Sequence, residues 1–566
     1  MFFHDYAIQA LAPHLPLSPG AIGALLETPP DRVLGDIAFP CYGLAQKWRK
    51  APASIATELA TKLDLTSPLA GATAVGPYVN LRLDRPAAGK LLLEHVLAKP
   101  DAWGGSGEGE GCTVCIDFCS PNVARPLHLG HLRSTVIGKA LSRLYATLGY
   151  RVVRINFLGD WGTQFGKLIA GWKRWGDQSK VQDDPIAELV RVYVRFHAEA
   201  KTAPALEAEG RAWFKRLEAG DREARALWEW IREQSLAGFA KTLTLLDVEF
   251  DSYAGEAFYH DKNQAVVDLL EARGLLVESE GAKVVELEGM PPCLILKSDG
   301  ATLYETRDIA AAMHRQATYR PARSLYVVDS GQSLHFRQVF AVIERLGEPW
   351  AGNLEHVGFG VMRVGGKRLR TRAGEVVYLD DVLAQAIALA REELELRSPG
   401  MDGAEEIARS IGVGAVIFND LRQHRLHDID FDPDEAISFD GETGPYVQYA
   451  HARCRNVLRR AGLAPGEVEA PADPVLAGEP EWALLSAMAA FPAAVQTAVR
   501  RNEPHVLARV LLDTAKALSR FYHDCPVLKA GEGARQARLA LVAATAVTLR
   551  RGLWMLGLEA PLMRAD

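Results

Sequence analysis

Two histidines three positions apart stand in a stretch whose residue types suit either a metal ion or a phosphate. The stretch is SPNVARPLHLGHLRST, residues 120–135, and it contains His128 and His131. A metalloprotease helix needs histidines four positions apart with a glutamate beside the first. Here Leu129 and Gly130 fill the interval, and the motif holds no carboxylate. The spacing therefore argues against zinc at this motif.

The position of the two histidines favours a phosphate site instead. The motif follows a predicted strand over 112–118 and begins a predicted helix. Doubly wound folds bind nucleotides at this edge of the sheet, and a helix N-terminus offers free N–H groups and a positive dipole. Gly130 would let a ligand approach the backbone, and His128 and His131 would donate hydrogen bonds to phosphate oxygens. The alternative is two surface histidines at the start of a helix.

Three cysteines just before this motif are a second metal candidate. Cys112, Cys115 and Cys119 lie close together, but the other cysteines are isolated, so no second pair completes a zinc site. Cys115 and Cys119 fall on alternate positions of a strand-like segment. We therefore expect small buried side chains there, and the odd total of seven cysteines does not describe a disulfide framework.

The elements around the motif alternate between strand and helix. Helical spacing of apolar residues predicts helices over 132–149, from about 163, over 308–318 and over 335–346. Short apolar runs predict strands at 112–118, 151–157, 293–297, 324–329 and 354–360. Such alternation predicts an α/β fold with a Rossmann-like, doubly wound parallel sheet.

Changes in pattern along the chain divide it into three parts. Residues 1–105 indicate a small α+β unit, which the glycine-rich segment 103–112 separates from the rest. The predicted sheet occupies 106–385, and a charged, helix-rich insertion at about 173–252 interrupts it. We interpret this insertion as structural. From 386 to 566 we expect no strands and an all-α bundle of at least five helices.

Composition and charge are those of a soluble enzyme. The chain has 566 residues, of which 48% are hydrophobic and 24% charged, with a net charge of −7. That charge argues against indiscriminate binding of nucleic acid but permits a local basic face, such as RCRNVLRR at 453–460. We find no secretory signal and no uninterrupted apolar run of membrane-spanning length, so we expect a cytoplasmic protein without a membrane partner.

The signature stretch and several others resemble the arginyl-tRNA synthetases, a family of class I aminoacyl-tRNA synthetases. The HxGH pattern alone is shared with other nucleotidyl transferases. The resemblance extends over essentially the full chain, from GDIAFPCYGLAQKWRKAP (35–52) through NFLGDWGTQFG (156–166) and LYETRDIAAA (303–312) to SFDGETGPYVQYAHAR (438–453). It implies a catalytic domain with an N-terminal additional domain that contacts the tRNA corner and a C-terminal anticodon-binding domain.

The resemblance implies a reaction in two steps. ATP and L-arginine give arginyl-adenylate and pyrophosphate, and arginine then passes to the 3′-terminal adenosine of tRNA(Arg), releasing AMP. Catalysis of this kind rests on positioning and on stabilisation of phosphate charge. His128, Gly130, His131 and Arg125 are the expected contacts to ATP, assisted by Mg²⁺ held mainly by the nucleotide.

Further residues are carried over from the family to the arginine site. A guanidinium is always charged and requires carboxylates. The family supplies an aspartate and a tyrosine, which here are Asp308 and Tyr304, and Glu256 matches a second carboxylate position. The remaining positions expected to contact arginine are Ser120, Pro121, Asn122, His131 and Gln332.

The second class I signature, a lysine-rich loop, is expected after the last strand of the sheet. The candidate is GGKRLRTRAGE at 365–375, in which we expect Lys367 and Arg370 to meet the pyrophosphate. This loop departs from the common lysine pattern, and so does Arg125, where many family members carry lysine. Both changes keep the positive charge, but arginine binds phosphate as a planar fork.

The resemblance places tRNA on the C-terminal helices. Aromatic side chains stack on unpaired bases and arginines bind phosphates. On this basis we expect tRNA contacts at Tyr446, Gln448, Tyr449 and Arg453. The alternative is that the tyrosines belong to the core.

Two other interpretations of the whole chain agree less well with the sequence. A noncatalytic RNA-binding paralogue would be expected to lose HLGH, Tyr304 or Asp308, and all are present. A class I synthetase for another amino acid disagrees with Tyr304, Asp308 and the additional N-terminal domain. A monomeric state is expected from the resemblance alone.

Overall fold

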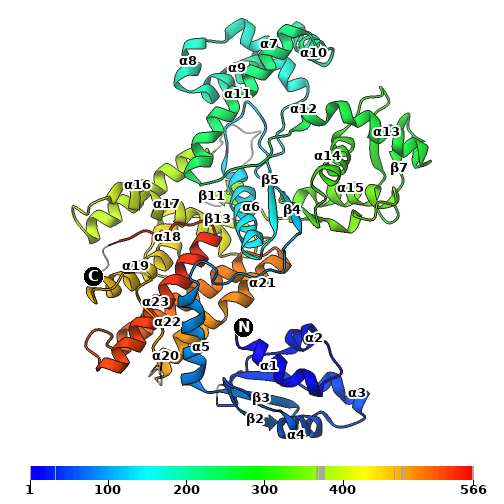
Figure 1. Ribbon diagram of the computed structural model, residues 1–566. Helices are drawn as coiled ribbons and strands as arrows, with labels where there is room; N and C mark the ends of the chain where they lie inside the picture. The colour runs from blue at the N-terminus through cyan, green and yellow to red at the C-terminus, as the bar shows by residue number, and fades with distance from the viewer. Residues whose placement is uncertain are drawn as a thin grey trace.

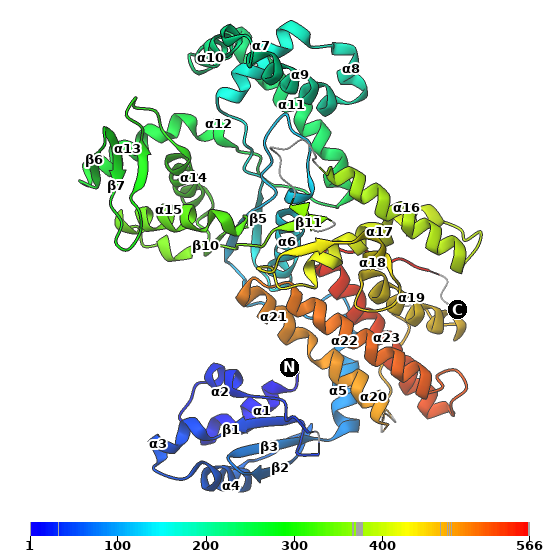
Figure 2. The same ribbon diagram turned by 180° about the vertical axis from the view of Figure 1, so that it is seen from behind.

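A central parallel sheet joins a small N-terminal unit, a helical insertion and a C-terminal helical bundle (Figure 1). The computed structural model describes residues 2–31, 33–364, 367–368, 377–464, 466–472, 474, 476 and 478–563. The N-terminal unit and the insertion lie at opposite ends of the molecule, with the sheet and the bundle between them (Figures 1 and 2). Both the α/β class and the helical C-terminal part are therefore confirmed.

The central sheet has four parallel strands in the order β10-β9-β4-β5. The chain enters at β4, moves to β5 at one edge and returns to β9 and β10 on the other side of β4. This reversal creates a switch point between β4 and β9, where the carboxyl ends of the two strands open a crevice. The strands are β4 (Thr113–Asp117), β5 (Arg151–Ile155), β9 (Arg323–Tyr326) and β10 (Leu354–His356).

Three helices around this sheet position the candidate site. The longest, α6 (Leu129–Thr147), begins at the histidine motif and is buried along most of its length, as a helix inside an α/β domain must be. The others are α14 (Tyr304–Tyr319), before β9, and α15 (Ser333–Arg345), after it. A short helix, α12 (Glu256–Tyr259), and α13 (Asn263–Ala272) precede α14 in the chain.

One predicted strand of the parallel sheet lies elsewhere. The segment 293–297 forms β8 (Cys293–Leu296), which pairs in a separate antiparallel sheet with β7 (Ala282–Val285) and through it with β6 (Leu276–Ser279). The prediction that it belongs to the parallel sheet is therefore wrong. Glu280 and Gly281 join β6 to β7 with positive φ angles of 51° and 76°, which suits a tight hairpin.

The insertion is helical, as predicted, and has a core of its own. Aromatic and branched side chains such as Phe165, Phe196 and Trp213 form this separate core. Its helices are α7 (Thr163–Trp175), α8 (Gln178–Asp183), α9 (Pro185–Ala200), α10 (Pro204–Glu218) and α11 (Arg222–Leu245). Because α7 shares this core, the helical unit begins before residue 173.

The N-terminal unit is an antiparallel sheet in the order β1-β3-β2, covered by short helices. Helix α5 leaves this unit and packs beside α20 and α23 of the bundle (Figures 1 and 2). In the segment 103–112 that follows, Trp103 is buried and its Nε1 donates to Thr548 Oγ1 at 3.0 Å. The glycine-rich segment is thus packed against the last helix of the bundle. The elements are α1 (His4–Leu11), α2 (Pro19–Leu25), β1 (Ile37–Pro40), α3 (Ala45–Trp48), α4 (Pro52–Lys62), β2 (Leu69–Val75), β3 (Tyr78–Leu83) and α5 (Arg85–Ala98).

The C-terminal part is a helical bundle, with one strand that the sequence did not indicate. The strand β13 (Ile429–Phe431) pairs in parallel with β11 (Met362–Val364), which also pairs with β12 (Lys367–Arg368). The prediction that strands stop near residue 385 is therefore wrong, because three residues are too short for a periodic signal. The helices are α16 (Leu379–Arg397), α17 (Ala404–Leu421), α18 (Pro433–Ile437), α19 (Gly444–Arg460), α20 (Glu479–Ala489), α21 (Phe491–Arg501), α22 (His505–Asp524) and α23 (Glu532–Met555).

One apolar stretch of the described chain has the length and composition to cross a membrane, contrary to our expectation. It runs from Glu479 to Arg501, comprises α20 and α21, and is 56% buried within the protein. Helices in the core of a helical bundle have the same composition.

Candidate active site

The loop that follows β4 is held in an unusual backbone conformation. Cys119, Ser120 and Ala124 have positive φ angles of 71°, 47° and 62°, which residues other than glycine rarely adopt. Side chains from three separate elements accept hydrogen bonds from this loop and hold it in place. The acceptors are Ser134 Oγ, 2.9 Å from the Cys119 nitrogen, Asn156 Oδ1, 3.2 Å from the Ser120 nitrogen, and Ser235 Oγ, 3.0 Å from the Ala124 nitrogen.

The conformation of this loop corrects one detail of the cysteine prediction. Cys119 lies beyond the end of β4 and does not alternate with Cys115 along a strand. Both thiols are buried, and burial raises the pKa of each to about 12. Among the described residues, no group of three or more histidine, cysteine or acidic side chains is arranged to hold a metal ion.

The two signature histidines stack at the N-terminus of α6. Their ring centroids lie 3.9 Å apart. His128 Nδ1 accepts a hydrogen bond from the Gly130 nitrogen at 3.0 Å, and His131 Nδ1 accepts one from the His128 nitrogen at 3.1 Å. Burial lowers the pKa of His128, assisted by the charge of Arg125, and burial with the neighbouring His128 lowers the pKa of His131 to about 3. Both rings are therefore neutral, with the proton on Nε2 as a hydrogen-bond donor.

Gly130 has a packing role in addition to the one that the sequence suggested. A Cβ atom at this position would lie 2.7 Å from Cε1 of His128. Any larger residue would push the His128 ring away from its stacked position. Arg125 is exposed, and its guanidinium lies 5.6 Å from the ring centroid of Tyr193 in the insertion.

A buried ion pair lies directly behind the loop. Ser120 Oγ donates to Asp117 Oδ1 at 2.9 Å, and Arg315 Nη2 donates to Asp117 Oδ2 at 2.7 Å. The sequence drew no attention to Asp117 or Arg315. The pair fixes the hydroxyl of Ser120, while Asn122 and Gln332 are exposed on the loops after β4 and β9, respectively. The two loops follow the carboxyl ends of adjacent strands, β4 and β9, at the switch point of the sheet.

The first predicted carboxylate, Glu256, is already paired with an internal cation. Its Oε2 lies 2.8 Å from Nη1 of Arg307, whose guanidinium carbon lies 4.6 Å from the ring centroid of Tyr304. Burial raises the pKa of Glu256 to about 7, against the opposing charge of Arg307. A guanidinium thus lies between two of the residues predicted to bind the guanidinium of arginine.

The second predicted carboxylate, Asp308, is also paired. Its Oδ2 lies 2.5 Å from Nε2 of His335, whose Nδ1 lies 3.6 Å from Oε1 of Glu305. Burial opposes the charged imidazole, but the contacts with Asp308 and Glu305 outweigh it and raise the pKa of His335 to about 9. His335 is therefore a cation at neutral pH. The sequence gave no reason to select it beyond its position three residues after Gln332.

Two predicted pyrophosphate contacts are only partly described. Arg370 lies outside the described residues, and only the backbone of Lys367 is described, in β12.

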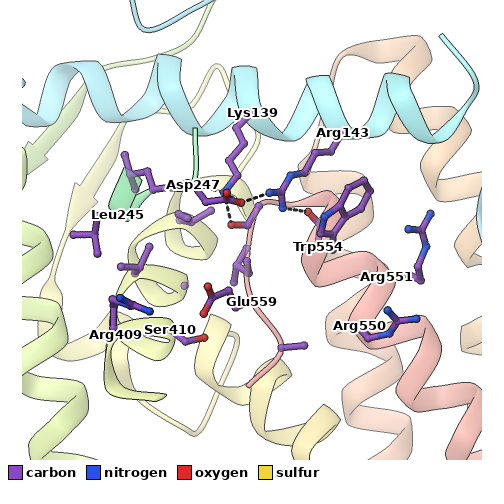
Figure 3. Close-up of a pocket in the computed structure, with 17 residues that line it drawn as sticks. Lys139, Arg143, Leu245, Asp247, Arg409, Ser410, Arg550, Arg551, Trp554 and Glu559 are labelled. Carbon is purple, nitrogen blue, oxygen red and sulfur yellow. Dashed lines mark hydrogen bonds and ion pairs between the residues drawn. The ribbon is translucent and has the colours of Figure 1, made fainter. Parts of the chain in front are cut away.

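A separate cavity of about 420 Å³ lies farther along α6, at its junction with α11, α17 and α23 (Figure 3). Lys139 is one of its lining residues, about 16 Å along the helix from His128. Lys139 Nζ donates to the carbonyl oxygens of Leu246 at 2.6 Å and Gly557 at 2.9 Å, and Asp247 pairs with it at 3.3 Å. The lysine thus connects the signature helix to the insertion and to the C-terminal segment.

The predicted tRNA-binding residues on α19 do not share one environment. Gln448 is fully buried, and its Nε2 donates to the carbonyl oxygens of Ser410 and Glu559. In this position its side chain packs the bundle, which favours the alternative of a core residue for this predicted RNA contact. Tyr449 is half-buried, and the guanidinium of Arg453 lies 4.9 Å from its ring centroid.

Arg453 also borders a cavity of about 240 Å³. Its guanidinium lies 5.2 Å from the ring of Tyr522, on α22, and Arg460 and Lys529 line the same cavity. Tyr446 is half-buried, with its hydroxyl 3.3 Å from Ser519 Oγ.

A parallel sheet with HxGH at the first helix N-terminus is the catalytic core of a class I aminoacyl-tRNA synthetase. Residues 93–433 match the family model described as "tRNA synthetases class I (R), catalytic domain". Residues 5–83 match the arginyl tRNA synthetase N-terminal domain, and residues 447–562 match the DALR anticodon binding domain. The chain belongs to the arginyl-tRNA synthetases.

Individual relatives agree with this assignment. The chain is 47% identical to an arginine–tRNA ligase of Clostridioides difficile and 46% identical to one of Enterococcus faecalis, with 96% of each chain covered in both cases. The solved Thermus thermophilus arginyl-tRNA synthetase is similar over 99% of both chains, with a TM-score of 0.83 and 29% identity. The chain is therefore an ATP-dependent ligase that charges tRNA with arginine.

Proposed function

We propose that arginine is activated in the crevice between β4 and β9, with its guanidinium held by Glu256, Tyr304 and Asp308. The observation that carries the proposal is the internal guanidinium of Arg307, which lies 2.8 Å from Glu256 and stacks on Tyr304. In this internal pair the carboxylate and the ring suit a planar, charged fork, and the substrate guanidinium binds beside Arg307, at the oxygen of Glu256 that the pair does not use. Ser120, Asn122, His131 and Gln332 hold the amino and carboxyl groups of the substrate, and Pro121 shapes the loop between the first two.

In the first step, a carboxylate oxygen of arginine attacks the α-phosphorus of ATP, and pyrophosphate leaves. The Nε2–H groups of His128 and His131 donate to phosphate oxygens, and the free N–H groups of α6 add to this stabilisation. Because both rings are neutral, they act as dipolar donors and need no proton exchange. Arg125, with Lys367 and Arg370 of the following loop, supplies positive charge to the departing pyrophosphate.

Magnesium fits this site as a companion of the nucleotide. The donors around the histidines are N–H groups and cations, which suit phosphate oxygens, and the described residues there include no carboxylate cluster for a metal ion. When bound, Mg²⁺ neutralises charge on the ATP phosphates.

In the second step, a hydroxyl of the terminal adenosine of tRNA(Arg) attacks the arginyl carbonyl carbon, and AMP leaves. The anticodon end of the tRNA binds the bundle face that carries Tyr446, Tyr449 and Arg453, beside the cavity bordered by Tyr522. Stacking on tyrosine and pairing of arginine with phosphate suit an unpaired RNA loop. Gln448 is omitted from this face because it is buried.

The organisation of the chain follows the same proposal. Residues 1–105 form the unit that meets the corner of the tRNA, 106–385 form the catalytic domain, and 386–566 form the anticodon-binding domain. The enzyme acts as a monomer in the cytoplasm.

The test is aminoacylation of total tRNA with each of the twenty amino acids, together with exchange of pyrophosphate into ATP. Arginine alone should be charged, and His131→Ala should lower the rate by at least about a hundredfold, the order of one lost transition-state donor. Asp268→Asn is the control, because Asp268 is exposed on α13 and its side chain accepts a hydrogen bond from Gln264 on the same helix. Charging of another amino acid, or full activity of His131→Ala, would refute the proposed site.

A further inference from the structure

Arg307 pairs with one of the two carboxylates of the proposed arginine pocket, Glu256. It lies on α14 between Tyr304 and Asp308 in the sequence, and its side chain crosses to Glu256, the first residue of α12. The Nη1–Oε2 distance is 2.8 Å, and the side chains of Arg307 and Glu256 are only 13% and 11% exposed. An ion pair so well shielded from water is stronger than one on the surface.

Two further contacts accompany the ion pair of the Arg307 guanidinium. Its Nε lies 3.4 Å from the carbonyl oxygen of Leu303, and its carbon lies 4.6 Å from the Tyr304 ring centroid. The ion pair uses Oε2 of Glu256. Oε1 of Glu256 takes no part in this ion pair and is the oxygen assigned above to the substrate guanidinium.

Glu256 depends on this cation for its charge. Besides Arg307, the charged groups that act on it are Asp308 on α14 and Asp160 in the loop after β5, and both are acidic. Asp160 is engaged elsewhere, with its Oδ2 3.0 Å from Nε of Arg232. Burial and the two acidic neighbours favour the protonated form of Glu256, and Arg307 favours the ionised form.

We propose that Arg307 is the positioning residue that keeps Glu256 ionised and oriented so that it can accept the guanidinium of the substrate. The proposal rests on the arginine pocket proposed above. Arg307 itself remains in place and does not react. With Arg307 and His335 as cations against Glu256, Glu305 and Asp308, the empty pocket carries one net negative charge, which a single monovalent cation such as arginine neutralises.

The test is the pH dependence of the arginine KM in the full-length Arg307→Met and Arg307→Lys variants. The rate of pyrophosphate exchange is measured at saturating ATP and tRNA between pH 6 and 8.5. In the wild type, the arginine KM should rise as the pH falls through about 7, where Glu256 takes up a proton. In Arg307→Met this transition should move upward by at least about one pH unit, so the KM at pH 7 rises about tenfold. The kcat should change less than about twofold, and Arg307→Lys should keep the wild-type midpoint.

Three results would overturn the role of Arg307. These are an unchanged midpoint in Arg307→Met, a KM increase that is equal at every pH, and a lower KM, which would make Arg307 a competitor of the substrate. The Glu256→Gln variant distinguishes an incorrect role for Arg307 from an incorrect arginine pocket. If Glu256→Gln leaves the arginine KM unchanged, the proposed pocket is wrong. If it raises the KM and abolishes the pH dependence, the pocket stands, and Arg307→Met added to Glu256→Gln should then produce no further shift.

Discussion

Replacement of Asp308 by asparagine removes one charge from the arginine pocket and preserves the shape of the side chain. The wild-type carboxylate lies 2.5 Å from the imidazolium of His335 and is the proposed partner of the substrate guanidinium. Loss of one partner of a desolvated, hydrogen-bonded charge pair costs about 2–5 kcal/mol. At about 1.4 kcal/mol per factor of ten, kcat/KM for arginine should fall between about 30-fold and several thousandfold.

The assay is pyrophosphate exchange with arginine as the varied substrate at pH 7.5, with Asp268→Asn as the control. Because the contact with Asp308 also raises the pKa of His335, that pKa should move downward in Asp308→Asn, which NMR of the imidazole measures. A kcat/KM within threefold of the wild type would refute the assignment of Asp308. A fall in kcat/KM without movement of the His335 pKa would refute the electrostatic link between the two residues.

Three further predictions concern stability and the signature loop. Because folding raises the pKa of His335 to about 9, the contacts of its charged imidazole contribute their full stabilisation to the fold below pH 6.5. That contribution, about 3 kcal/mol, should be lost as the pH rises through 9. Urea unfolding should show this fall in the unfolding free energy for the wild type and no such fall for His335→Asn. Arg133 and Asp420 form a buried pair with a 2.9 Å contact, so Asp420→Ala should lower the unfolding free energy by about 3–5 kcal/mol; a loss below 1 kcal/mol would contradict this. Gly130→Ala displaces the His128 ring and should lower pyrophosphate exchange at least about tenfold with an unchanged melting temperature; normal exchange would argue against stacking as a requirement.

The sequence was sufficient for much of the fold because its signals are local. Helical periodicity located α6, α14 and α15, and short apolar runs located β4, β5, β9 and β10. Periodicity does not specify a strand's partner, and β8 was therefore assigned to the wrong sheet. The three-residue strand β13 depends entirely on pairing with β11 and carries no periodic signal.

The α19 helix shows that the sequence alone does not identify which residues of a helix are exposed on the surface. Its pattern of aromatic and basic residues predicted an RNA-facing side, but α19 packs on α17, α22 and α23, so little of it faces water. Tyr449 and Arg453 keep some exposure, whereas Gln448 is fully enclosed. Which side of a helix is free is decided by its neighbours in the bundle.

For the site, the sequence alone supplied the candidate residues: His128 and His131 through their spacing and position, and Glu256, Tyr304 and Asp308 through family resemblance. Only the tertiary structure decided their charge and orientation. Asp117 and Arg315, 198 positions apart, meet behind Ser120, and Arg307 and His335 pair with Glu256 and Asp308, the two carboxylates of the proposed pocket. The physical reason is that charge state depends on burial and on neighbours in space, and both are set when distant segments pack together.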